Sequence, residues 1–446
     1  MNFKLTALLV LCAISMTMAQ KKIWTLEECV TYAVENNLSI QQFELDLENA
    51  TIDKSDAIGS FLPNLNGTLN VQSNTGLSFD PTNSQPVNTK QITSSGSVTS
   101  SVLLFDGLRN VHRLNRAKLN AVANQYRLDD LVNDIRLNVA ISYLNILSNK
   151  ETAKVAKALY AVTEQDLNRT RELVESGVVP KGDLLEIEAT AATREQQIIN
   201  AENDVLISRI NLAQLLQITD YENFDVSDAE FEVPPADILK NSPKVIFDKA
   251  LSYWYETKFF ETSVDLAEKD LSFAKGAAYP TLSAFINYNT RYSDQFFDPI
   301  TGQVIPFKDQ LWINDGIAFG AQISIPVFNG FSTRNNIKRS QINVKKAQLD
   351  LEQNKLDLET NINQAYVDVV NSSKAYEAAL KTREARALAL EYSRERFDVG
   401  ILNSFDYSQA QARVDNAEAE VIRTKYDYVF RIKVLEFYFG LPIVID

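Results

Sequence analysis

The segment Ser101-Val-Leu-Leu-Phe-Asp-Gly107 recurs as Ser324-Ile-Pro-Val-Phe-Asn-Gly330, at a shift of 330 − 107 = 223 residues. The same shift pairs Tyr143 with Tyr366 and places Gly177 opposite Gly400. One register holds from the duplicated stretch into the turns that carry these glycines. A repeat of this length predicts two homologous structural halves.

The repeat also sets the expected division of the chain. Residues 1–19 carry one lysine, an apolar run and a final small residue, which is the pattern of a cleavable secretory signal peptide. We expect the first half over 20–216 and the second half over 243–446. A linker over 217–242, which contains two consecutive prolines, joins them.

Each half is expected to run helix, β-hairpin, very long helix, tight turn and helix. The hairpins are predicted over 62–106 and 280–329. Apolar and polar residues alternate from Leu65 to Gln72 and from Ile317 to Val327, the period of a strand with one apolar and one polar face. Such a strand suits a place between lipid and a watery lumen. A soluble sandwich with one solvated face fits the strands equally well.

The segments after the hairpins indicate unusually long helices. Proline is absent from 108–175 and from 331–398, and Ala, Leu, Glu, Lys, Arg and Gln dominate both. Helices of this length would be roughly 100 Å long at the standard rise per residue. Apolar residues keep coiled-coil spacing along them, in steps of four, three and four. These are Leu358, Ile362, Ala365 and Val369, with Ile135, Val139, Ser142 and Ile146 as their repeat mates.

Composition excludes several classes of function. The chain has 44 basic and 58 acidic residues, a balance that argues against nucleic-acid binding through a basic face. After the signal, no apolar run reaches the length of a membrane helix, so entry into a membrane would require a closed β-barrel. His112 is the only histidine, and no catalytic triad, metal-ligand cluster or phosphate loop occurs. We therefore predict no enzymatic activity, no cofactor and no bound metal. Cys29, the one cysteine of the mature chain, is expected to pack between helices.

Four features in order resemble the TolC-like outer membrane efflux protein family over essentially the whole mature chain. They are the opening Trp24-Thr-Leu-Glu-Glu-Cys-Val-Thr-Tyr-Ala-Val-Glu-Asn-Asn37, the strand ends Phe105-Asp-Gly107 and Phe328-Asn-Gly330, two helix-turn-helix tips, and the duplication. The tips read Glu175-Ser-Gly-Val-Val-Pro-Lys-Gly-Asp-Leu-Leu185 and Asp398-Val-Gly-Ile-Leu-Asn-Ser-Phe-Asp-Tyr407.

The resemblance implies a mainly α fold of long antiparallel coiled-coil helices that form an α-barrel. Each subunit would add four strands to a trimeric twelve-stranded β-barrel. It further implies a homotrimer in the lipid of the cell outer membrane that extends into the periplasm. The trimer would be the passive exit duct of a tripartite efflux or type I secretion system. Its partners would be a periplasmic adaptor and an inner-membrane pump.

The resemblance also places an aperture at the periplasmic tips, with Asp406 in its constriction. Three copies of this carboxylate would form a ring that favours cations, although Asp406 could equally serve only the dipole of its helix. Gly177 and Gly400 are expected to end helices in the left-handed conformation, with Ser404 as a candidate N-cap. We expect the tip turns to contact the adaptor. Its predicted contact residues are Gly177, Val178, Gly400, Ile401 and Ser404.

Three positions depart from the family pattern at this aperture. A second acidic residue is replaced by Gln409, and the aromatic hydroxyl and arginine of the closed state are replaced by Phe397 and Leu402. The usual polar lock to Asp183 is therefore not expected. Our hypothesis is that closure depends on apolar packing of Phe397 and Leu402.

A soluble, secreted coiled-coil scaffold or a periplasmic adaptor is the alternative interpretation. An adaptor would carry a single helical hairpin flanked by small β-domains, whereas this chain has two hairpins with strands between its helices. The pattern of elements therefore favours the channel.

Overall fold

The computed structural model describes residues 22–79, 85–228 and 233–441, so the expected signal peptide lies outside the described residues. The chain forms two compact units. The helical unit holds the described residues up to Glu44 together with Tyr126–Lys258 and those from Gln353 onward. The sheet unit holds Leu45–Gln125 and Phe259–Glu352.

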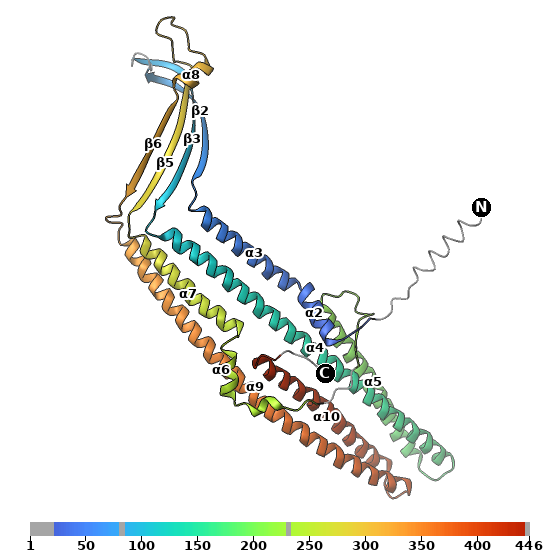
Figure 1. Cartoon of the computed structure of the whole chain (residues 1–446). Coiled ribbons are helices and arrows are strands. Elements are labelled where there is room, and N and C mark those ends of the chain that lie inside the picture. Colours follow the sequence, from blue (N-terminus) through green and yellow to red (C-terminus); the bar gives the residue numbers. More distant parts are fainter. Residues whose placement is uncertain (1–21, 80–84, 229–232, 442–446) are drawn as a thin grey trace, which may run out of the picture. The chain divides into compact units, whose positions relative to one another are not determined.

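The helices repeat with the spacing that the sequence predicts (Figure 1). The very long helices α4 (Arg109–Glu175) and α9 (Ser332–Asp398) both have 67 residues. The helices that follow them, α5 (Lys181–Leu215) and α10 (Ser404–Tyr438), both have 35. All four begin and end in register at the shift of 223 residues. The two halves are thus structural copies of each other.

The shorter helices follow a smaller shift of 217 residues, which is also the distance between Pro63 and Pro280, the prolines that precede the two hairpins. They are α2 (Leu26–Asn36) and α3 (Leu38–Gly59) in the first half, and α6 (Pro243–Ala250) and α7 (Tyr255–Gly276) in the second. The break after α2 lies at Asn37, whose backbone is extended and whose side-chain oxygen accepts from the amides of Ser39 and Ile40. An asparagine that offers this local acceptor favours the start of a new helix.

The sheet unit contains one antiparallel sheet of four strands in the order β2-β3-β5-β6. The strands are β2 (Asn64–Phe79), β3 (Pro86–Phe105), β5 (Thr281–Ser293) and β6 (Gly316–Ser324). β6 is shorter than the alternation to Val327 predicts. Pro326 has no amide hydrogen to continue the ladder. The connection between β5 and β6 also contains a short helix, α8 (Phe307–Ile313), which the sequence analysis missed.

The strand register gives the sheet one apolar and one polar face, because directly opposite residues of antiparallel strands share a face. Leu282 pairs with Ile323, and Ile286 pairs with Phe319. The apolar side chains are exposed in the single chain, for example 78% for Leu69 and 82% for Phe319. On the other face, Thr68 hydrogen-bonds Ser97 and Asn287 donates to Thr99. The apolar face includes Leu65, Leu69, Val71, Ile92, Val98, Val102, Leu282, Ile286, Tyr288, Ile317, Phe319 and Ile323.

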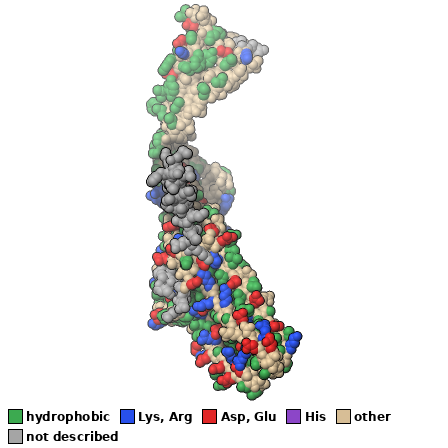
Figure 2. Space-filling view, turned by 90° about the vertical axis from the view of Figure 1, so that its right-hand side faces the viewer, with side chains coloured by type: hydrophobic (Ala, Val, Ile, Leu, Met, Phe, Trp, Pro, Cys, Tyr) green, Lys and Arg blue, Asp and Glu red, His purple; other side chains and the backbone are tan. Residues whose placement is uncertain are grey.

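Charge is almost absent from this sheet. Lys90 and Arg291 are the only charged residues of the four strands. In Figure 2 hydrophobic side chains gather over the strands, whereas acidic and basic side chains crowd the surface of the helical unit. The exposed apolar face therefore lacks the charged side chains that a protein surface in water normally carries.

The helical unit has a core built on the coiled-coil positions. In the second half, Leu358, Ile362 and Val369 of α9 pack with Ile432 and Leu435 of α10, and all five are buried. The linker takes part through Ile238 of the 3₁₀ helix η1 (Asp237–Lys240), and Ile246 of α6 joins the same cluster. In the first half, Ile135, Val139 and Ile146 are buried as expected.

Cys29 packs inside the helical unit as predicted, with no exposed surface. Burial raises the pKa of its thiol to about 12, so the thiol stays protonated and unreactive. Close to it, β1 (Ile23–Trp24) pairs in parallel with β4 (Asp225–Val226), a two-residue ladder that was not predicted. Among the described residues, no helix combines the length and the apolar composition needed to cross a membrane.

Candidate functional site

The candidate site consists of the two helix-turn-helix tips, α4–α5 and α9–α10, in the helical unit. At each tip the first helix ends on a glycine with positive φ, +74° at Gly177 and +76° at Gly400. The following amide closes the end by donating to a carbonyl five residues back: Val178 to Leu173, and Ile401 to Arg396. A residue with a Cβ would be strained at either glycine. The predicted left-handed helix ends are therefore present.

The second helix of each tip begins differently. The side-chain oxygen of Asn403 accepts from the amide of Asp406 at 2.8 Å, which makes Asn403 the N-cap of α10. The prediction that Ser404 is the N-cap is wrong. Both residue types are good caps, and the backbone enters the helix one residue earlier than the sequence suggested. Pro180 precedes α5 without a side-chain cap.

Ser404 instead links the two tips. Its buried hydroxyl donates to the Asp183 carboxylate of α5 at 2.6 Å. This contact differs from the family's usual lock to Asp183, because it forms within one chain and its donor is a serine. It joins a residue of the predicted aperture, Asp183, to a predicted adaptor-contact residue, Ser404.

Phe397 packs against a partner that the sequence analysis did not identify. Its ring stacks on Tyr407 of α10, with centroids 4.8 Å apart and planes inclined by 5°. Tyr407 is buried and donates its hydroxyl to Asp166 of α4 at 2.9 Å. Burial, followed by the nearby Asp166 carboxylate, raises the pKa of Tyr407, so the phenol remains a donor. Leu402 is half-buried in the turn.

Asp166 is the centre of a polar cluster between α4, α9 and α10. Its side chain is 8% exposed. It accepts from Tyr407 and from Gln411, both at 2.9 Å, and the guanidinium of Arg394 lies 3.9 Å away. A buried carboxylate is stable only with such partners. This cluster ties three helices together just behind the tips.

A largely buried ion pair joins α5 to α10 farther from the turns. The guanidinium of Arg194, 5% exposed, lies 2.8 Å from the Asp415 carboxylate, 16% exposed. Burial raises the pKa of Asp415, although Arg194 lowers it in part. The Nε of Arg194 is buried without a hydrogen-bond partner among the described atoms.

The remaining predicted site residues lie on the surface of the tips. Asp406 and Gln409 are exposed, and Gln409 accepts from Arg413 at 2.9 Å. Val178 and Ile401 are 68% and 69% exposed. Phe405, which the sequence analysis missed, is 60% exposed beside them. The tips therefore present apolar side chains next to the exposed carboxylate of Asp406.

Removing the N-cap should loosen the first turn of α10. Asn403→Ala leaves the amide of Asp406 without its acceptor and is expected to cost about 1 kcal/mol. Hydrogen exchange of residues 404–407 should accelerate several-fold. Asn403→Asp retains a cap oxygen and should leave the exchange nearly unchanged. Equal exchange in the alanine and aspartate variants would contradict this cap assignment.

Known proteins resemble this chain both in sequence and in fold. The family model described as outer membrane efflux protein matches residues 30–216 and 260–440. Outer membrane protein TolC of Vibrio cholerae is 22% identical over 302 residues, which cover 66% of this chain and 65% of that protein, so the match spans less than two thirds of its length.

Solved structures of similar fold cover nearly all of the chain. The Campylobacter jejuni CmeC outer membrane channel superposes with a TM-score of 0.76 at 16% identity, covering 93% of this chain and 85% of its own. The open state of the Neisseria gonorrhoeae MtrE outer membrane channel gives a TM-score of 0.71 at 16% identity, covering 93% and 88%. These likenesses establish the long-helix and four-strand architecture as a known fold.

Proposed function

The chain belongs to the outer membrane efflux protein family, whose members are channels and not enzymes, and from this premise we propose that three copies form one exit duct. The duct would cross the outer membrane and extend into the periplasm. It would act as the passive component of an efflux or secretion system. A periplasmic adaptor and an energised inner-membrane pump would supply the rest.

One observation carries this proposal: the four-stranded sheet has an exposed apolar face and ends in two edge strands, β2 and β6. Lipid tolerates neither unpaired backbone groups nor polar side chains. An apolar face with so little charge fits acyl chains, whereas the Ser, Thr and Asn face fits water in a lumen. If β2 of one copy pairs with β6 of the next, three sheets close as a twelve-stranded barrel and leave no edge.

Membrane fractionation separates this proposal from a soluble scaffold or adaptor. The mature protein should sediment with outer membranes and require detergent for extraction. It should then migrate as a heat-modifiable trimer. A monomer released in the periplasmic fraction without detergent would overturn the proposal.

We propose further that Asp406 from three copies lines the periplasmic aperture. The exposed carboxylate at the start of α10 supports this, because three of them near one axis would attract cations. Asp406→Asn should lower the cation-to-anion permeability ratio of the trimer and weaken its block by divalent cations about tenfold, since about 1.4 kcal/mol of attraction corresponds to that factor.

Glu359→Gln provides a matched control, because it removes one exposed carboxylate from α9 far from the tip. Permeability ratios from reversal potentials in planar bilayers report the difference. If Asp406→Asn gives the same permeability ratio and divalent block as the control, Asp406 only stabilises the start of α10, and the three carboxylates do not form a ring. Because both variants should still form conducting trimers, that result would leave the duct itself standing.

A further inference from the structure

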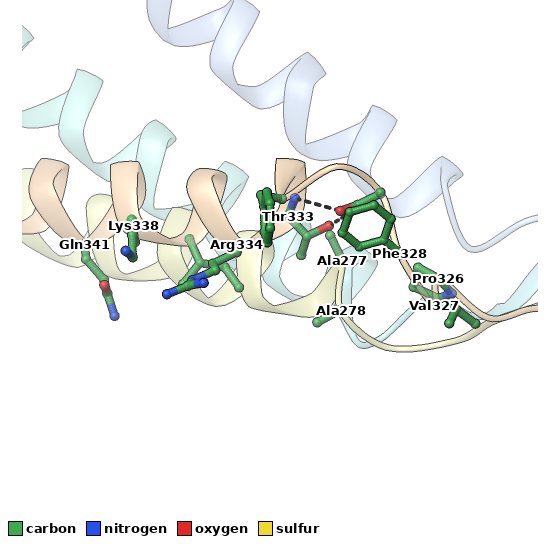
Figure 3. A pocket seen from close by; sticks show the side chains of 12 residues that line it. Ala277, Ala278, Pro326, Val327, Phe328, Thr333, Arg334, Lys338 and Gln341 are labelled. Carbon is green, nitrogen blue, oxygen red and sulfur yellow. Dashed lines mark hydrogen bonds between the residues drawn. The ribbon is translucent and has the colours of Figure 1, made fainter.

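A groove lies in the sheet unit where β6 passes into α9 (Figure 3). Its volume is about 500 Å³, and Ala277 and Ala278, which follow the end of α7, form its other wall. Phe328 and Phe331 contact each other edge to face at 5.6 Å between centroids. Arg334, Lys338 and Gln341 follow along α9 at helical spacing, on the side that lines the groove. The groove thus combines aromatic rings with a row of cationic and polar groups.

The apolar part of the groove continues the apolar face of the sheet. Ile325 and Val327 follow β6 and are 63% and 92% exposed. Val327, Phe328 and Phe331 line the groove. The row of exposed apolar side chains therefore ends where the cationic side chains begin. Aromatic and basic residues at the end of an apolar band are typical of a protein surface at the level of lipid headgroups.

The N-terminal end of α9 carries positive charge, the sign that is unfavourable at the start of a helix. Residues 332–349 include five basic residues and no acidic one, although the whole chain has a net charge of −14. Positive groups at a helix N-terminus are unfavourable to the helix dipole, and acidic groups there are favourable. The dipole effect is confined to the first turn and so disfavours Arg334 alone. The five cations together form a positive surface that is complementary to an anion.

The repeat provides an internal comparison. The start of α4 is also free of acidic residues, but its arginines have partners in the chain. Arg116 pairs with Asp270 at 2.7 Å, and Arg109 and Arg113 lie over the ring of Phe273. Over the described residues, neither Arg334 nor Lys338 lies within ion-pair distance of a carboxylate, and both are exposed. Arg334 and Lys338 are therefore available to an external ligand.

We propose that this groove binds the phosphate headgroups of anionic phospholipids in the periplasmic leaflet of the outer membrane. The acyl chains would follow Val327 onto the apolar face of the sheet, with the headgroup at Arg334 and Lys338. The proposal rests on the proposed function, in which that face meets lipid. Bound lipid would fix the depth of the duct in the membrane.

Lipid binding to the purified, delipidated trimer tests this proposal. Native mass spectrometry counts the lipids retained during titration with phosphatidylglycerol or with phosphatidylcholine. Phosphatidylglycerol should bind preferentially and less tightly at high salt. Each cation near an anionic lipid raises the affinity several-fold. The double variant Arg334→Gln with Lys338→Gln should therefore weaken phosphatidylglycerol binding about 30-fold.

The control variant carries Lys374→Gln with Arg386→Gln, which removes two exposed charges from α9 in the helical unit. It should bind phosphatidylglycerol like the unmodified protein. Equal retention of both lipids, or equal loss in both variants, would overturn the proposal. Displacement of the lipid by an equal concentration of soluble glycerol phosphate would overturn it too, because the site would then recognise free phosphate. Failure to isolate any trimer would instead count against the proposed function.

Discussion

Arg194→Met should open the α5–α10 pair of the helical unit about 100-fold more often than in the unmodified protein. The substitution keeps most of the side-chain volume but leaves the Asp415 carboxylate, which is 16% exposed, without its partner. Breaking a buried ion pair from one side typically costs about 3 kcal/mol or more, and each 1.4 kcal/mol corresponds to a factor of ten. Hydrogen exchange of residues 187–201 and 408–422 reports this opening directly.

The pH dependence of this loss has a definite sign. Burial already raises the pKa of Asp415, and Arg194 opposes that rise. Without Arg194 the folded-state pKa moves further above the unfolded value, so the folded variant binds a proton more tightly. The loss of stability is therefore greatest above that folded-state pKa and diminishes as the pH falls through it.

Two further variants control for the loss of an arginine and for the loss of the charge pair. Arg413→Met removes an exposed arginine of α10 and should change exchange little. Asp415→Leu added to Arg194→Met removes both buried charges and should restore much of the protection. If Arg194→Met and Arg413→Met exchange alike, the buried pair does not hold the two helices together.

Asp166→Ala should likewise make the helices behind the tips open more often. It removes the acceptor of both Tyr407 and Gln411, and each buried donor left unsatisfied costs about 1–3 kcal/mol. The three helices joined by this cluster would then separate more readily. We expect at least a tenfold loss of exchange protection around Tyr407 and a higher single-channel conductance.

Glu164→Ala serves as the matched control, because Glu164 is an exposed carboxylate on the same helix two residues away. Tyr407→Phe tests the mechanism more finely, since it removes one donor and retains the stacked ring. Its effect should lie between those of the control and of Asp166→Ala. Unchanged protection and conductance in Asp166→Ala would show that the cluster does not restrain the tips.

The duplication made most of the fold predictable. Both pairs of long helices begin and end at positions that differ by the shift read from Gly107 and Gly330. Hydrophobic spacing identified Ile362 and Val139 as core residues, and both are completely buried. Such local patterns are sufficient to predict these elements, because long helices and regular strands depend mainly on nearby residues.

The buried polar contacts of the tips escaped the sequence analysis, although the repeat contains a signal for them. Asp166, Arg194 and Asp415 correspond to Ala389, Ala417 and Ala192 under the 223-residue shift. A charge in one half opposite an alanine in the other marks a position where the two copies have diverged. Composition alone could not identify which charges were buried, because long exposed helices carry many charges.

Other features depend on the backbone path and not on residue type. Asn403 and Ser404 are both good caps, so the sequence could not decide between them. The β1–β4 ladder pairs two-residue strands some 200 residues apart, and strands that short have no detectable alternation. The stacking of Phe397 on Tyr407 likewise joins two helices whose relative rotation the hydrophobic pattern does not specify.

The current passed by the purified mature protein in planar lipid bilayers is the most direct measure of the proposed duct. We expect discrete, long-lived ion-conducting steps from a preparation that is trimeric by mass. A water-soluble monomer that passes no current at any protein concentration would contradict it.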